Sequence, residues 1–259
     1  MIAAALARTR IAITGSTGFV GTALVERLLR QVPDCELVLL VRPGRRTSAT
    51  QRVKREILRN DAFNRMRESL GGPGFDVMTE RRVHTIAGDV GTDGLGLDDT
   101  DRATFAGCDI VIHSAATVAF DSPLDSAVEV NLLGPTRIAQ TLGSLGVTPH
   151  LVAVSTCYVA GNRRGAAPEI AVHDSPFFID VDWRGEVDGA RRARTDAEAD
   201  SRRPEALARF RKEARTEIGA AGVPAIAGKT EQRRSAWVKE QMVEAGRARA
   251  ASLGWPSRS

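Results

Sequence analysis

The first 30 residues contain a short apolar run, a glycine-rich turn and an amphipathic segment in direct succession. Ile11-Ala12-Ile13 leads into Thr14-Gly15-Ser16-Thr17-Gly18-Phe19-Val20-Gly21, and residues 23–29 have helical periodicity. This order predicts a buried strand, a tight turn and a helix whose free N–H groups and positive dipole end face the turn. Glycines at this spacing let a backbone pass close to a pyrophosphate, so a dinucleotide is the expected ligand. The alternative is that the glycines only form a turn and allow close helix packing.

Four further apolar runs follow, each separated from the next by a helical or turn-forming stretch. They lie at residues 36–41, 82–88, 109–116 and 150–155, and helices are expected over about 48–70 and 124–145. Gly71-Gly72-Pro73-Gly74 is expected to end the first of these helices. Alternating strands and helices predict an α/β fold with a doubly wound parallel sheet of the Rossmann type, and ligands then bind beyond the carboxyl ends of the strands.

The composition changes after residue 161, where arginine and alanine become abundant and strand-like runs end. Two long helical patterns, at about residues 188–221 and 229–252, are separated by Gly222-Val223-Pro224 and Gly228. We therefore expect two domains. The first is an NAD(P)-binding Rossmann domain over residues 9–162, and the second is an Arg/Ala-rich, partly mobile helical insertion or tail over residues 163–259.

Charge and composition argue against several classes of protein. The net charge is +4, and the excess lies after residue 159, where 19 basic residues are mixed with 15 acidic ones. Such mixing is typical of a solvated helix face, so no nucleic-acid partner is expected. No apolar run reaches the roughly 18 residues of a membrane span, and the N-terminus has no secretory pattern, so the expected location is the cytoplasm. The three cysteines and four histidines lack ligand spacing, so we expect no metal and interpret the histidines near strands as structural.

Polar residues follow the carboxyl ends of the second and third apolar runs. Arg42 ends the second run, where a cation accommodates the 2′-phosphate of NADP and a carboxylate would favour NAD. An arginine fork matches a phosphate in both geometry and charge, so NADP(H) is the predicted cofactor. The alternative is a solvated strand end. Asp89-Val90 ends the third run, where the aspartate could bind the adenine amine or cap a turn.

Three more segments complete the candidate site. Ser114-Ala115-Ala116 ends the fourth run, and its small side chains would let a nucleotide lie against the backbone. Asn131 interrupts an apolar helix face, which predicts a buried hydrogen bond. Ser155 and Thr156 end the fifth run and are the candidate hydroxyls for polarising a substrate carbonyl, although such a pair is more often a turn or a cap.

Together these segments resemble the extended short-chain dehydrogenase/reductases, and most of all the fatty acyl-CoA reductases with a male-sterility-type NAD-binding domain. Besides the glycine turn, the similar segments are Leu40-Val41-Arg42, Gly88-Asp89-Val90, His113-Ser114-Ala115-Ala116-Thr117-Val118, Val130-Asn131 and Val154-Ser155-Thr156-Cys157-Tyr158-Val159. The resemblance covers residues 10–162 and implies NADPH-dependent reduction of a long-chain acyl thioester to an aldehyde or an alcohol. It implies that the cofactor is bound by Thr14, Gly15, Ser16, Thr17, Gly18, Phe19, Val20, Gly21, Arg42, Asp89, Val90, Ser114, Ala115, Ala116 and Asn131.

The catalytic residues that the resemblance implies are only partly present. Aligning Gly161 with the family pattern favours Thr156 over Ser155 as the hydroxyl that assists at the carbonyl. The family also uses a tyrosine as general acid and a lysine four residues later, yet the one tyrosine of this chain, Tyr158, is followed at that spacing by Asn162. We therefore expect an N-terminal portion of a reductase that is inactive by itself. The alternatives are a non-catalytic NADP-binding sensor or scaffold and an epimerase-type extended reductase.

Overall fold

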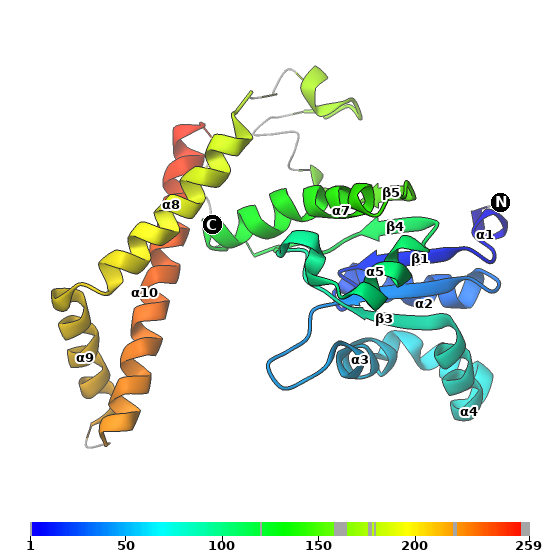
Figure 1. The fold of residues 1–259 in the computed structure, drawn as a ribbon, viewed down its shortest axis with the longest axis horizontal. Coiled ribbons are helices and arrows are strands. Elements are labelled where there is room, and N and C mark those ends of the chain that lie inside the picture. Colours follow the sequence, from blue (N-terminus) through cyan, green and yellow to red (C-terminus); the bar gives the residue numbers. More distant parts are fainter. Residues whose placement is uncertain are drawn as a thin grey trace. The chain divides into compact units, whose positions relative to one another are not determined.

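A computed structural model describes residues 2–119, 121–157, 165–175, 178, 180–219 and 222–254. Five parallel strands form one sheet in the order β3-β2-β1-β4-β5 (Figure 1). This order confirms the predicted doubly wound α/β fold, and it places a topological switch point between β1 and β4, where such sheets bind ligands. The strands are β1 Arg10–Thr14, β2 Glu36–Val41, β3 Val83–Ala87, β4 Ile110–His113 and β5 His150–Ala153.

Successive residues of each inner strand pack into different cores, because side chains alternate across a sheet. One face of the sheet contributes Ile11, Ile13 and Leu39 to a core with α2 (Phe19–Gln31), the π-helical turn η1 (Val53–Leu58) and α4 (Asn64–Arg82). The opposite face contributes Ala12, Val38 and Val111 to a core with α5 (Asp99–Ala106) and α7 (Leu133–Ser144). Helices therefore cover both faces, which explains why β2 reads as a nearly continuous apolar run.

The predicted helix end at Gly71-Gly72-Pro73-Gly74 is confirmed, but a second helical segment, which the sequence analysis did not predict, begins directly after Gly71. α4 therefore consists of two helical segments that are separated at Gly71, whose φ of 68° and ψ of 161° are not helical, and the second segment runs to Arg82. Pro73 is compatible with this arrangement because a proline is tolerated in the first turn after a break. The expected helix before the kink is also divided into α3 (Ala49–Arg52), η1 and the 3₁₀ turn η2 (Asp61–Phe63).

Arg82 belongs to the end of α4, although the sequence pattern assigned it to the third strand. Its buried guanidinium donates hydrogen bonds of 2.8 Å to the backbone carbonyls of Leu29, Val32 and Cys35. These carbonyls lie in the last turn of α2 and just beyond it, where backbone acceptors lack intrahelical partners. Arg82 thus links α4 to α2 and fixes where β3 begins.

The chain divides into two compact units. Unit 1 comprises residues 1–116 and 129–155 and contains the sheet, and unit 2 comprises residues 117–128 and 156–259. Unit 2 contains α6 (Leu124–Ala127), the 3₁₀ turn η6 (Val172–Asp174), α8 (Trp183–Ser201), α9 (Pro204–Ile218) and α10 (Val223–Ser252). The single helix expected over residues 188–221 is two helices, because the chain turns at residues 202–203 before Pro204 begins α9. The domain boundary at residue 162 stays a prediction, since residues 158–164 lie outside the described part.

A buried ion network holds the helices of unit 2 together. The Arg234 side chain in α10 is 10% exposed and donates to Glu198 of α8 at 2.6 Å and to Ser201 at 2.9 Å. Val238 and Met242 pack beside it against Ala197 in a small apolar cluster. None of the helices in the described part of the chain is long and apolar enough to cross a membrane.

Candidate dinucleotide-binding site

The glycine turn joins β1 to α2 at the switch point of the sheet and has no room for side chains at two positions. Gly15 has a φ of 74°, and a Cβ placed on it would lie 2.5 Å from the backbone N of Ala115. A Cβ on Gly21 would lie 2.2 Å from the carbonyl O of Gly15. Gly15 therefore allows the turn to meet the end of β4, and Gly21 allows α2 to pack directly on the turn.

The first turn of α2 faces solvent and lacks a side-chain cap. Gly18 is the N-cap residue and offers no side-chain hydrogen bond, whereas Phe19 and Val20 are 94% and 57% exposed. Free N–H groups and the helix dipole at such an end attract an anion. The exposed Phe19 and Val20 leave the N-terminus of α2 open at the surface.

Ser16 and Thr17 complete the turn between Gly15 and Gly18. Ser16 is buried, and its Oγ has no hydrogen-bond partner among the described residues. Its backbone carbonyl accepts from Thr22 Oγ1 at 3.0 Å, and Thr17 is half-buried. A buried hydroxyl without a partner, beside an uncapped helix end, fits the pyrophosphate of a dinucleotide.

Thr14 connects the glycine turn to the end of β4. Its Oγ1 lies 2.7 Å from His113 Nδ1 and accepts from the Ala115 N–H at 3.3 Å, and its carbonyl accepts from Ser114 Oγ at 2.8 Å. Thr14 is fully buried, and burial lowers the pKa of His113. His113 is therefore the structural, hydrogen-bonded histidine that the sequence predicted. Thr14 fixes the position of the glycine turn relative to the end of β4.

Arg42 and Asp89 meet at the carboxyl ends of β2 and β3. Arg42 Nη1 lies 3.5 Å from Asp89 Oδ2, and the Arg42 side chain is 69% exposed. Asp89 Oδ1 also accepts from the Gly91 N–H at 2.8 Å, so the turn-capping alternative for Asp89 is realised while its second oxygen faces the arginine. The structure thus brings together two predicted site residues at the sheet edge that follows the glycine turn.

Three further predicted positions differ in burial. Val90 is buried in the core and lies next to Gly134 of α7, while Ala115 is half-buried and Ala116 is exposed at the end of β4. Asn131 was predicted to be buried, and this was wrong: Asn131 is exposed in the π-helical turn η4 (Val128–Leu132). A π-helical turn rotates the residues that follow out of the α-helical register, and such turns are frequent at functional sites.

Arg137 organises this edge, and the sequence analysis missed it. Its buried guanidinium donates to Asp93 Oδ1 at 2.7 Å and to Glu129 through both the backbone carbonyl, at 2.9 Å, and Oε2, at 2.5 Å. Arg137 therefore ties the loop after β3 to the π-helical turn that carries Asn131. An arginine among apolar residues of a predicted helix was the available signal, but its partners could not be read from the sequence.

The two candidate carbonyl-polarising hydroxyls follow β5 at the edge of the sheet. Ser155 and Thr156 are both exposed, and the chain passes from unit 1 to unit 2 between them. Val154, just before them, donates its N–H to the His113 carbonyl at 2.8 Å, which extends the pairing of β5 with β4. Tyr158, Gly161 and Asn162 lie outside the described residues.

A parallel sheet with a glycine cradle at its switch point defines this chain as a dinucleotide-binding protein of the Rossmann type. The sequence profile described as "Male sterility protein", an NAD-binding family, matches residues 13–250, and the chain belongs to this family. It therefore contains an NAD(P)-binding domain of the kind that the sequence resemblance indicated.

The chain is also similar to individual proteins and to a solved structure. The chain is 32% identical over 173 residues to "Probable fatty acyl-CoA reductase 5" of Arabidopsis thaliana. The aligned region covers 66% of this chain and 34% of that protein. It is 31% identical over 153 residues to "Fatty acyl-CoA reductase wat" of Drosophila melanogaster, covering 59% and 28%. The solved terminal R domain of the myxalamid PKS-NRPS pathway has a TM-score of 0.49 at 23% identity, covering 74% of this chain and 46% of that one. The chain spans about a third of the length of the curated relatives it matches.

Proposed function

We propose that unit 1 binds NADPH for the reduction of a long-chain fatty acyl thioester. The observation that carries this proposal is the exposed, uncapped N-terminus of α2, which follows the glycine turn at the switch point of the sheet, with Arg42 at the end of the neighbouring strand. Arg42 would hold the 2′-phosphate, the N–H groups at the start of α2 would hold the pyrophosphate, and Asp89 would orient Arg42 or the adenine. When bound, the cofactor supplies a hydride.

The proposed substrate class is supported by the names of the relatives, which are fatty acyl-CoA reductases. Within this chain, the Thr156 hydroxyl, or that of Ser155, would donate a hydrogen bond to the thioester carbonyl oxygen. Such a bond strengthens as negative charge develops on that oxygen, so it accelerates the reaction more than it aids binding. Ser114, Ala115 and Ala116 would let the nucleotide pass close to the end of β4.

A second candidate function is NADP binding without catalysis. The observation in its favour is that Tyr158 is followed at the fourth position by Asn162, so this tyrosine does not form the tyrosine–lysine pair. Loss of a general acid lowers a rate by about 10²- to 10⁴-fold. The 259-residue chain would then bind the nucleotide and leave an acyl thioester unreduced.

One experiment separates these functions. Purified protein is titrated with NADPH by fluorescence, and NADPH oxidation with palmitoyl-CoA is followed at saturating cofactor. Binding with oxidation supports the reductase, and binding without oxidation supports the non-catalytic module. Absence of NADPH binding would refute both proposals, and a Thr156→Val variant that oxidises NADPH at the unchanged rate would refute the role of Thr156.

A further inference from the structure

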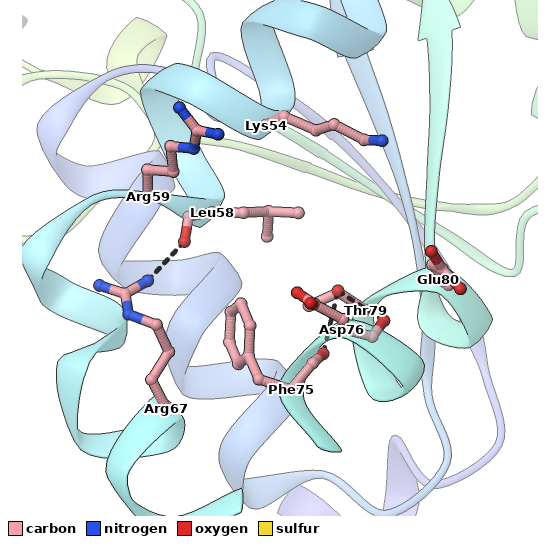
Figure 2. A pocket seen from close by; sticks show the side chains of 8 residues that line it. All are labelled: Lys54, Leu58, Arg59, Arg67, Phe75, Asp76, Thr79 and Glu80. Atoms are coloured by element: carbon pink, nitrogen blue, oxygen red, sulfur yellow. Dashed lines mark hydrogen bonds between the residues drawn. The ribbon is translucent and has the colours of Figure 1, made fainter. Parts of the chain in front are cut away.

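A pocket of about 600 Å³ lies between η1 and α4 and uses none of the residues of the candidate dinucleotide site (Figure 2). Its apolar lining is Leu58 and Phe75. Lys54 and Arg59 lie on its η1 side, and Asp76 and Glu80 come from the second half of α4. The pocket falls in the size range of small-molecule sites, but its rim is unusually rich in charge.

One wall of the pocket is fixed by contacts with the core. The buried Phe75 ring packs edge-on against Phe63, with ring centroids 5.9 Å apart. The Arg67 guanidinium lies 5.6 Å from the centre of the Phe75 ring and donates to the carbonyls of Leu58 and Asn60 at 2.6 and 2.9 Å. Arg67 and Phe75 therefore form a preorganised surface, which reduces the entropy lost on binding.

The kink at Gly71 sets the direction of the helical segment that carries Phe75, Asp76 and Glu80. The positive φ of this glycine redirects the second half of α4, and Figure 2 shows Asp76 and Glu80 across the open space from Arg59. The Thr79 hydroxyl donates to backbone carbonyls of its own helix, so its proton is already engaged. Recognition in this pocket therefore depends on the charged groups and the apolar floor.

The four rim charges have no ion-pair partners in the described part of the chain. This holds for Lys54 and Arg59 on one side and for Asp76 and Glu80 on the other. On the same layer of helices, Arg52 and Glu56 do pair, at 2.7 Å. The third cation of the lining, Arg67, is engaged with backbone carbonyls, so two unpaired cations and two unpaired anions remain available to a ligand.

We propose that this pocket binds a small zwitterion with an apolar middle. Its anionic end would contact Lys54 and Arg59, its ammonium would contact Asp76 and Glu80, and its methylene groups would cover Leu58 and Phe75. A simple anion would leave the two carboxylates without a counter-charge, and a simple amine would leave Lys54 and Arg59 without one. The proposal is independent of cofactor binding.

The test uses 6-aminohexanoate as the zwitterionic probe, with hexanoate and hexylamine as singly charged controls of equal chain length. Each is titrated into the isotopically labelled full chain, and backbone amide shifts are followed by NMR. We expect shifts confined to residues 54–59 and 75–80, with each control binding about two- to fivefold more weakly, the effect of losing one exposed charge pair.

Variants assign the two ends of the probe. Arg59→Gln and Glu80→Gln should each weaken 6-aminohexanoate about two- to fivefold, while Arg55→Gln and Glu68→Gln, on the same two helices but outside the pocket, should leave its affinity unchanged. Hexanoate that binds as tightly as 6-aminohexanoate would overturn the proposal in favour of a plain anion site. Shifts elsewhere, or none at millimolar probe, would overturn it as well.

Discussion

Gly15 is the residue on which the geometry of the glycine turn most depends, and Gly15→Ala tests that dependence. Its φ of 74° lies in the left-handed region, where a residue with a side chain loses roughly 1–2 kcal/mol. The added Cβ would also lie 2.5 Å from Ala115 N and 2.6 Å from the Ser114 carbonyl carbon. Both contacts are with backbone, so they cannot be relieved by rotating a side chain, and overpacking of this kind costs about 1–3 kcal/mol.

The two effects together should lower the free energy of unfolding by about 2–5 kcal/mol. For a chain of this size that corresponds to a fall in Tm of roughly 5–15 °C. Because the turn must move away from Ser114 and Ala115, NADPH affinity should also fall. Differential scanning calorimetry and a fluorescence titration with NADPH measure the two effects.

Two other glycines provide matched controls. Gly18→Ala has an ordinary φ of −83° and a Cβ contact of 3.3 Å with the Gly15 carbonyl O, so it should lose less than about 1 kcal/mol. Gly72→Ala meets no atom within 4 Å and lies in a helix, so Tm should be unchanged or slightly raised. If Gly15→Ala melts within 2 °C of the wild type, as Gly72→Ala should, the strain argument is refuted.

Three further predictions concern buried polar groups. Burial lowers the pKa of His113 in the folded chain below the ordinary histidine value of about 6.5. The unfolded chain therefore binds more protons than the folded chain as the pH falls below about 6.5. The free energy of unfolding should have its full value above that pH and decrease below it. Denaturant melts at several pH values should show that His113→Gln flattens this dependence, and an identical slope in the variant would contradict it. Arg137→Met should lower the free energy of unfolding by about 1–3 kcal/mol, less than for a fully buried pair because Asp93 is 94% exposed, and urea titration checks this. Burial raises the pKa of Cys108 to about 11, so iodoacetamide at pH 8 should label the exposed Cys157 long before Cys108 by mass spectrometry, and equal labelling would show that the thiol is accessible.

Much of unit 1 could be predicted because its signals are local. The glycine turn, the apolar run of β2 and the alternation of strands with helices each follow from a few consecutive residues, and the alternation predicts a parallel, doubly wound sheet. The contact between Thr14 and His113 could not be predicted from local signals, because the two residues are 99 positions apart in the sequence. The sequence indicated only that the histidine was structural.

The errors arose where tertiary packing competes with local preference. Gly71 does break the helix as predicted, but the second helical segment after it was missed, because the packing of Phe75 in the core is not visible in the local sequence. Arg82 resembled the start of a strand, yet three backbone carbonyls of distant residues hold it at the end of α4. Asn131 was expected to be buried because its neighbours are apolar, but the π-helical turn shifts the register and exposes it.

The cofactor preference of Arg42 tests the central claim most directly. Equilibrium titration of the wild type, Arg42→Ala and the nearby exposed Arg45→Ala with NADPH and with NADH gives the ratio of the two affinities for each protein. We predict that the wild type and Arg45→Ala prefer NADPH by roughly 10- to 100-fold, the value of a charged hydrogen bond to the 2′-phosphate, and that Arg42→Ala loses this preference. Equal affinities in the wild type, or a preference that survives in Arg42→Ala, would contradict the assignment of this edge as the NADP site.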